Sequence, residues 1–283
     1  MNIKRTELDL REELDRIKSE NKDLIVGFVP TMGALHHGHA QLIKKAIEQS
    51  DFVVVSVFVN PTQFNKEADL ENYPRTEEAD IELLRSLGCD LLFLPSIKDV
   101  YPDSLDSKKI DLNGLDLVME GAFRPGHFDG VVTVVNRFFE IVQPTKAFFG
   151  KKDFQQLAII NRMVEVLEWE IQIIGIDIQR SIEGLALSSR NSLLSDQELK
   201  DALIIHETMT FGKSIYKDGM STISLKSDME AFFNKGNLEL EYLSIIDNKS
   251  LQEVTTVNED CTVCIAAYCG EVRLIDNTQF GDF

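Results

Sequence analysis

The sequence has little proline and no long hydrophobic run. Only 7 of its 283 residues are proline and 43% are apolar, which argues against a disordered chain and allows one large or two ordinary domains. The longest apolar run, at 52–59, is interrupted by Ser56 and is far shorter than the roughly 20 residues that span a bilayer. The first twenty residues are charged throughout and do not resemble a secretory signal. We therefore expect a cytoplasmic protein that does not enter a membrane.

Positive charge is also scarce. The chain has 29 Lys and Arg residues against 47 Asp and Glu residues, a net charge of -18 at pH 7. Such an acidic surface repels nucleic acids and anionic membranes. We expect no nucleic-acid partner, and any site for a phosphate compound must be local.

Cysteine is rare, with four residues, of which Cys261 and Cys264 form a CxxC pair. Such a pair can be half of a zinc site or a redox pair. However, the segment 261–268 has the composition of a strand, in which residues three apart point to opposite faces, and no second ligand pair accompanies it. Buried free thiols are the expected outcome.

Short apolar segments alternate with helical patterns over the first two thirds of the chain. The expected strands are 24–29, 52–59, 91–94, 147–149 and 171–178. Helical spacing follows the first and fourth strands, and we also interpret 131–142 as helix although it is rich in β-branched residues. This alternation predicts an α/β fold with a doubly wound, Rossmann-like parallel sheet, which binds ligands at the carboxyl ends of its strands.

The character of the chain changes in its last third. A charged helical stretch beyond residue 194 precedes two expected strands, at 238–247 and 261–275. This pattern indicates a smaller α+β domain. We expect two domains, at 1–185 and 186–283, which together account for the whole chain.

Three of the five histidines follow the first strand, in the segment PTMGALHHGH at 30–39. His36 and His39 are three residues apart and share one face at the start of a helix, where free N–H groups and the helix dipole favour anions. Gly38 allows a ligand to approach the backbone closely. Imidazoles here can donate hydrogen bonds to a polyphosphate and stabilise the charge that develops as pyrophosphate leaves. The alternative is a pair of surface or capping histidines.

Two further clusters follow later strands. FGKKDFQQ at 149–156 offers glycine and lysine to a phosphate, and its Asp153 can cap a helix or bind a ribose. GLALSSRN at 184–191 has the small residues, hydroxyls and arginine of a mobile phosphate clamp. Either cluster alone could be an ordinary loop. Together with the segment at 30–39, which we call the histidine turn, they resemble the paired signatures of the adenylyl-transferring superfamily that includes class I aminoacyl-tRNA synthetases.

The full set of motifs resembles the pantothenate synthetase family, the pantoate–β-alanine ligases of coenzyme A synthesis, over nearly the whole chain. Further matching segments are SVFVNPTQF at 56–64, YPRT at 73–76, EGAFRPGHFDGVVTVVNR at 120–137 and RLIDN at 273–277. The resemblance implies an ATP-dependent ligase that converts pantoate to pantoyl adenylate with release of pyrophosphate. β-Alanine then displaces AMP to give pantothenate. It also implies Mg²⁺ on the phosphates and a homodimer.

The resemblance implies a role for individual residues. The implied catalytic residues are His36, His39, Lys152 and Arg190, with His39 as proton donor. The implied ATP-binding residues are Met32, Gly33, Ala34, Leu35, His36, His37, Gly38, His39, Gly150, Lys151, Lys152, Asp153, Gln179, Leu187, Ser188, Ser189 and Arg190. Gln63 and Gln156 would bind the acid substrates, pantoate above all, through amides that donate and accept without adding charge.

Two implied assignments have ordinary alternatives. Asp80 matches an acidic position near the family's magnesium and pyrophosphate, but it could be a surface charge of a helix. His127 lies in a motif at the pocket rim, but it could be a structural loop residue.

The chain departs from the family pattern at two places. Ser181, Ile182 and Glu183 stand where the family has an acidic and a small residue before Asp-Gly. Glu67 and Asp69 are both candidates for an acidic residue whose context is shifted. The departures concern details of the ATP contacts.

Three other functions compete with the ligase. A nucleotidyltransferase that transfers AMP or CMP to a phosphorylated acceptor would use the same histidine turn, but it would need additional cationic residues. A tRNA synthetase is disfavoured by the acidic net charge, because tRNA binding needs a basic face that the sequence does not indicate. A non-catalytic ATP-sensing module would not need to keep the four implied catalytic residues together.

Overall fold

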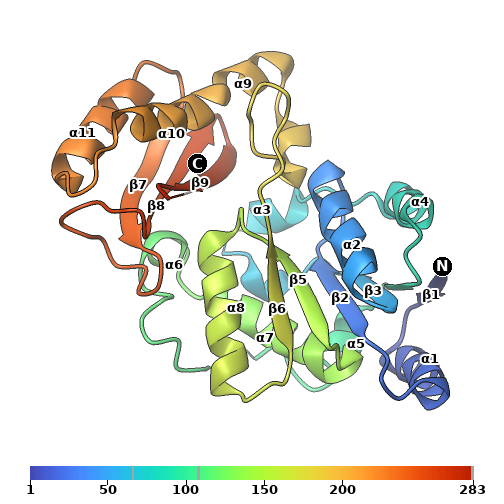
Figure 1. Cartoon of the computed structure of the whole chain (residues 1–283). Helices are drawn as coiled ribbons and strands as arrows, with labels where there is room; N and C mark the ends of the chain where they lie inside the picture. The colour runs from blue at the N-terminus through green and yellow to red at the C-terminus, as the bar shows by residue number, and fades with distance from the viewer. Residues whose placement is uncertain (66, 107–108, 282–283) are drawn as a thin grey trace.

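The computed structural model describes residues 1–65, 67–106 and 109–281. Its described part contains a six-stranded sheet and a three-stranded sheet (Figure 1). The first sheet is parallel throughout, in the order β1-β4-β3-β2-β5-β6. Its strands are β1 (Asn2–Lys4), β2 (Val26–Thr31), β3 (Phe52–Val57), β4 (Leu91–Phe93), β5 (Lys146–Gly150) and β6 (Gln172–Ile176). We call this sheet with its helices the N-terminal unit.

Helices cover both faces of this sheet, as strands that are apolar along their whole length require. They are α1 (Glu7–Glu20), α2 (His37–Gln49), α3 (Glu67–Glu71), α4 (Glu77–Leu87), α5 (Ile97–Val100), α6 (Met119–Phe123), α7 (His127–Val142) and α8 (Phe154–Val166). Along β2, Phe28 packs in the core cluster that contains α1, α7 and α8, while the next residue, Val29, packs with α2 and α4. The doubly wound α/β fold is confirmed.

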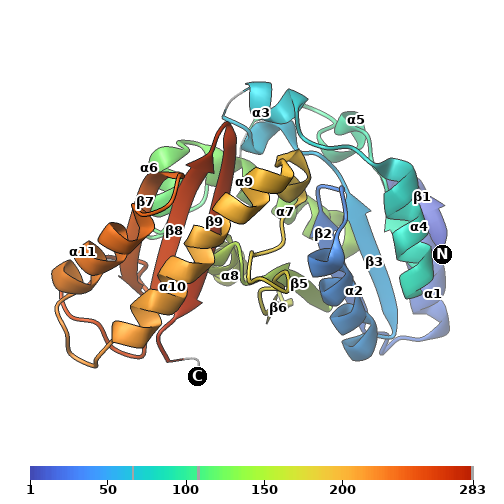
Figure 2. The same cartoon turned by 90° about the horizontal axis from the view of Figure 1, so that it is seen from above.

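The C-terminal unit is the smaller α+β part that the sequence predicts. It contains the 3-10 helix η2 (Ser189–Leu193), α9 (Asp196–Asp201), α10 (Leu203–Ile215), α11 (Thr222–Phe233), and the antiparallel strands β7 (Glu239–Asp247), β8 (Cys261–Cys269) and β9 (Val272–Gln279). Figure 2 shows this unit, in orange and red, beside the parallel sheet. In the described part of the chain, no helix is long and apolar enough to cross a membrane.

One expected strand was wrong, and one strand was missed. The segment 261–275 is not one strand, because Gly270 adopts a left-handed φ of 58° and starts the turn that separates β8 from β9. β1 was not predicted, since three residues are too short to show a periodic pattern.

The expected helix at 131–142 is confirmed as part of α7, whose residues are almost all buried. The four cysteines are free and buried, as expected. Cys261 and Cys264 lie in different core clusters and so occupy opposite faces of β8.

Candidate active site

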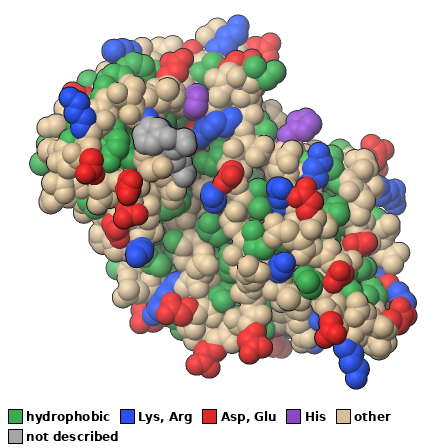
Figure 3. All heavy atoms as spheres, viewed as in Figure 1, with side chains coloured by type: hydrophobic (Ala, Val, Ile, Leu, Met, Phe, Trp, Pro, Cys, Tyr) green, Lys and Arg blue, Asp and Glu red, His purple; other side chains and the backbone are tan. Residues whose placement is uncertain are grey.

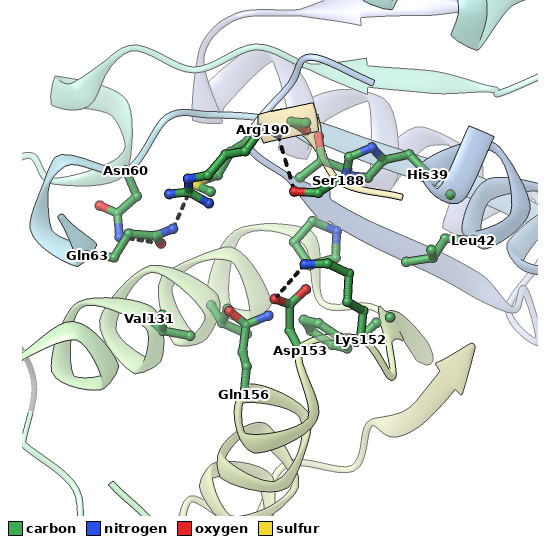
Figure 4. Close-up of a pocket in the computed structure, with 18 of the residues that line it drawn as sticks. His39, Leu42, Asn60, Gln63, Val131, Lys152, Asp153, Gln156, Ser188 and Arg190 are labelled. Carbon is green, nitrogen blue, oxygen red and sulfur yellow. Dashed lines mark hydrogen bonds and ion pairs between the residues drawn. The ribbon is translucent and has the colours of Figure 1, made fainter. Parts of the chain in front are cut away.

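A cavity of about 230 Å³ lies at the carboxyl ends of β2, β5 and β6, next to α7 and the start of α2. Figure 4 shows His39, Lys152, Gln156 and Arg190 around this common space. The predicted site residues that line it are Met32, His36, Gly38, His39, Gln63, Gly150, Lys152, Asp153, Gln156, Gln179, Leu187, Ser188, Ser189 and Arg190. The predicted residues outside the lining are Gly33, Ala34, Leu35, His37, Asp80 and Lys151. Segments separated by more than 150 residues thus meet in one cavity.

His36 and His39 form the cap of α2. The backbone N–H of Gly38 donates to Nδ1 of His36 at 3.0 Å, and the backbone N–H of His36 donates to Nδ1 of His39 at 3.3 Å. This reciprocal arrangement is a capping box. Because each Nδ1 accepts a hydrogen bond, the proton of each neutral ring is on Nε2, which is therefore a donor.

Both rings are neutral at pH 7. Burial, with the nearby charge of Lys152, lowers the pKa of His36 to about 4. Burial, with His36 and Lys152, lowers the pKa of His39 to about 3. In its neutral form His39 can donate a hydrogen bond from Nε2 to a bound anion, and its role as proton donor stays a prediction.

Asp80 supports the histidine turn from behind. It is 3% exposed, and its carboxylate accepts from the backbone N–H groups of Ala34 at 3.0 Å and Leu35 at 2.8 Å, and from the Thr76 hydroxyl at 3.1 Å. Gly33 fits here because it has a φ of 80° and a Cβ would stand 3.0 Å from the Asp80 carboxylate. Asp80 is therefore a brace for the turn, and its assignment to the metal stays a prediction. Among the described residues, no group of three or more His, Cys, Asp or Glu side chains could hold a metal ion.

The two lysines after β5 point in different directions. The Lys152 ammonium lies at the cavity, 3.8 Å from the carboxylate of Asp153 (Figure 4). Lys151 instead pairs with the exposed Asp177 at 2.6 Å. Asp153 occupies the N-cap position of α8 without a side-chain capping bond. Its carboxylate remains at the cavity, where it can accept from a ligand hydroxyl.

Gln63 belongs to the short 3-10 helix η1 (Pro61–Gln63), which packs against α7. The Nδ1 of buried His127 is 2.7 Å from the carbonyl oxygen of Gln63. Since a carbonyl only accepts, Nδ1 carries the proton, and Nε2 accepts from Arg124 at 3.2 Å. Gly130 is needed because a Cβ there would come within 2.4 Å of the Thr62 carbonyl oxygen. His127 lines the cavity and also supports Gln63, the residue predicted to bind pantoate.

Sequence reasoning missed two residues that line this part of the cavity. The side-chain amide of Asn60 donates to the Gln63 side chain at 3.3 Å and to the Gly130 carbonyl at 3.1 Å. Arg124 adds a cation at the cavity. Both lie inside motifs of the family resemblance, and that position is the only signal for them.

Arg190 reaches the cavity from η2. Its guanidinium pairs with Asp69 at 3.0 Å and lies 5.6 Å from the centre of the Tyr73 ring. Of the two acidic candidates, Asp69 is therefore the one that meets the clamp. The departure at 181–183 lies in a turn outside the cavity lining, and Ile182 is fully exposed there.

The cavity holds a local group of positive charges. Lys152, Arg190 and Arg124 line it although the chain has a net charge of -18. Figure 3 shows one face of the described part of the molecule, where acidic and basic side chains are interspersed without a broad basic patch. A site of this kind suits a small polyanion.

Comparison with known proteins establishes the family. The model of the family described as pantoate-beta-alanine ligase matches residues 2–279. The chain belongs to this family. Pantothenate synthetases from Bacteroides fragilis and Phocaeicola vulgatus are 46% and 47% identical to it, with 99% of each chain covered in both cases.

Solved structures of pantoate–β-alanine ligases have the same fold. The pantothenate synthetase from Thermus thermophilus matches with a TM-score of 0.92 and 37% identity, covering 99% of both chains. The ligase from Francisella tularensis, in complex with beta-gamma ATP and beta-alanine, matches with a TM-score of 0.83 and 36% identity over 100% of this chain and 99% of that one.

Proposed function

We propose that this protein is an ATP-dependent ligase that joins pantoate to β-alanine through a pantoyl adenylate, releasing AMP and pyrophosphate. The observation that carries the proposal is that His36, His39, Lys152 and Arg190, from three separate motifs, line one cavity. Membership of the pantoate–β-alanine ligase family over nearly the whole chain supports it. The related Francisella tularensis ligase is complexed with beta-gamma ATP and beta-alanine.

In this proposal ATP lies across the carboxyl ends of β2 and β5. The Nε2–H groups of the two histidines, the Lys152 ammonium and the Arg190 guanidinium contact the phosphates, while the backbone at Gln179 meets the adenine. Gly38 leaves the backbone accessible, and Asp153 accepts from the ribose. Arg190 exchanges its contact with Asp69 for a phosphate, which is the stronger charge.

Pantoate lies beside Gln63 and Gln156. Its carboxylate oxygen attacks the α-phosphorus, and the bond from that phosphorus to the bridging oxygen breaks to release pyrophosphate. The β-alanine amine then attacks the acyl carbon, AMP leaves, and the amine loses a proton. The apolar wall that α7 contributes, including Val131 and Val134, limits access of water to the adenylate.

Mg²⁺ fits this site as a complex with ATP. Because the described residues supply no ready cluster of ligands, the phosphate oxygens would be its main ligands, which is common for this ion. The metal would neutralise phosphate charge, while the four cationic or donor side chains orient the nucleotide.

The cellular location, the oligomeric state and the domain boundaries are also proposals. From the family resemblance we propose a cytoplasmic homodimer, which sedimentation of the purified protein would test. We further propose domains at 1–185 and 186–283. Limited proteolysis should cut first near residues 181–183, where Ile182 is fully exposed.

The decisive experiment is exchange of labelled pyrophosphate into ATP. With pantoate and Mg²⁺ present and β-alanine absent, exchange should occur, because adenylate formation is reversible on the enzyme. A ligation that needs all three substrates together would show none, and a nucleotidyltransferase would not depend on pantoate. A sensing module would exchange nothing.

Lys152→Ala should reduce this exchange more than it reduces conversion of supplied pantoyl adenylate to pantothenate. The reason is that amide formation develops less charge at the α-phosphate than adenylyl transfer does. Equal losses in the two half-reactions would assign Lys152 to general binding of the adenylyl group.

A further inference from the structure

Asn277 of β9 holds the backbone that carries Lys152. Its side-chain Nδ2 donates to the carbonyl oxygens of Lys151 at 3.0 Å and Lys152 at 2.8 Å. The residue is 5% exposed and belongs to the RLIDN segment, to which the proposed ATP and pantoate contacts assign no task. The C-terminal unit therefore makes direct contact with the loop after β5.

The orientation of this amide is fixed chemically. Carbonyl oxygens only accept hydrogen bonds, so the NH₂ group must face them, and a carboxylate in its place would repel both. The backbone of Asn277 is held as well. Its N–H donates to the buried carboxylate of Asp276 at 2.8 Å, and Asp276 pairs with Arg180 at 2.6 Å.

The loop has a second anchor on its other side. The N–H of Lys151 donates to the carbonyl of Ile176 in β6 at 2.8 Å. Asn277 and β6 thus hold the loop from two sides. Between these anchors the Lys152 side chain lines the cavity, while Lys151 forms an ion pair with Asp177 and does not line it. Loss of the Asn277 bonds would free the Lys152 carbonyl and let its side chain shift.

We propose that Asn277 is a positioning residue for adenylyl transfer, acting through Lys152. The inference rests on the proposed function, in which Lys152 contacts the phosphates during that step. A displacement of about 1 Å at a reacting group can cost roughly a hundredfold in rate. The position of the C-terminal sheet would thereby determine whether the phosphate site is correctly formed.

The test compares Asn277→Ala and Asn277→Asp with a matched control, Asn136→Ala. Asn136 is 4% exposed, and its side chain donates to Glu140 at 2.7 Å and accepts from Trp169 at 3.0 Å, away from the cavity lining. Both Asn277 variants should lower the maximal rate of pantoate-dependent exchange roughly ten- to a hundredfold, with little change in KM for pantoate. The control should lose stability and keep its exchange rate.

A double-mutant cycle separates positioning from general stability. In a Lys152→Ala background, Asn277→Ala should cause almost no further loss of exchange, because the group it positions is gone. Equal losses in both backgrounds, or a loss no larger than that of Asn136→Ala, would overturn the inference. Wild-type protein without exchange would instead overturn the proposed function, on which the inference depends.

Asn277→Ser is a milder substitution that keeps the inference testable if the other variants fail to fold. A serine hydroxyl can still donate one hydrogen bond, so we expect an exchange rate between those of the wild type and Asn277→Ala. If the alanine and aspartate variants do not fold, a folded serine variant with the full rate would overturn the inference.

Discussion

At the scale of the residue, His39 combines a structural and a chemical task in one ring. Its Nδ1 accepts from the backbone N–H of His36, and its Nε2–H is left to face the cavity. The capping bond fixes the ring without using the donor. A side chain held in advance in this way can stabilise developing charge without reorganisation during the reaction.

We predict that His39→Ala lowers turnover on the order of a hundredfold, the usual cost of losing one such donor. Folding should change less, because a lost cap costs about 1 kcal/mol. Steady-state kinetics and urea unfolding measure the two effects. The exposed Lys44 on the same helix provides the control variant Lys44→Ala. A His39→Ala protein with normal fold and near-normal turnover would contradict the role.

His127 makes a prediction about pH. Burial, with the charge of Arg124, lowers its pKa to about 3 in the folded protein, against about 6.5 in an unfolded chain. Below pH 6.5 the unfolded state therefore binds a proton that the folded state excludes. The stability due to neutral His127 is complete above pH 6.5 and is lost as the pH falls toward 3.

The free energy of unfolding should accordingly fall between pH 7 and pH 5, at up to about 1.4 kcal/mol per pH unit for each such group. His127→Gln should fall less steeply, since its amide can donate to Gln63 without titrating. His36 and His39 act in the same direction and leave a residual slope. Urea unfolding at several pH values measures it, and identical slopes for variant and wild type would contradict the prediction.

At the scale of the element, the start of α2 depends on a residue of α4. Asp80 is the first-turn residue of α4 that accepts two backbone N–H groups of the turn before α2. The turn has no regular secondary structure of its own between β2 and α2. Its shape is therefore supported by a contact with α4, a helix on the same face of the sheet as α2.

We predict that Asp80→Ala lowers the free energy of unfolding by about 2 to 3 kcal/mol, because buried N–H groups lose a charged acceptor. Turnover should fall as the histidine turn loosens, and excess Mg²⁺ should not restore it. Asp80→Asn keeps one acceptor oxygen and should lie between the alanine variant and the wild type. Full recovery of activity at high Mg²⁺ would instead support a metal-binding role for Asp80.

At the scale of the whole molecule, a buried ion-pair network joins the two units. Arg273 of β9 contacts both carboxylate oxygens of Glu120 in α6, at 2.7 and 2.8 Å, and also contacts Glu241. Tyr242 donates to Glu120 at 2.9 Å. Burial opposes the charge on Glu120, but its bonds to Arg273 prevail and lower its pKa to about 2.

We predict that Arg273→Ala destabilises the protein by about 3 to 5 kcal/mol, because Glu120 is left buried without its main partner. In the wild type, the stability from Glu120 is present above about pH 4.5 and is lost as the pH falls toward 2. This acid-dependent loss should shrink in the variant. Urea unfolding at pH 7 and pH 3.5 gives both quantities, and an unchanged acid slope would contradict the assignment.

The sequence alone determined the parallel sheet, the family and the three motifs that meet at the cavity. Strand and helix patterns depend on residues close in the chain, and this holds for 131–142, whose helical spacing outweighed its β-branched composition. The motifs at 30–39, 149–156 and 184–191 follow strand or loop ends, which parallel topology brings together. Periodicity and motifs therefore sufficed for these features.

Only the tertiary structure decided what supports the site. Three contacts support it: Asp80 bonds to the turn before α2, His127 bonds to Gln63, and Asn277 bonds to the backbone of Lys151 and Lys152. These contacts join residues 45 to 126 positions apart. The break at Gly270 likewise depends on the pairing of β8 with β9. Such contacts depend on how packed elements orient their side chains, and no local pattern of residues encodes that orientation.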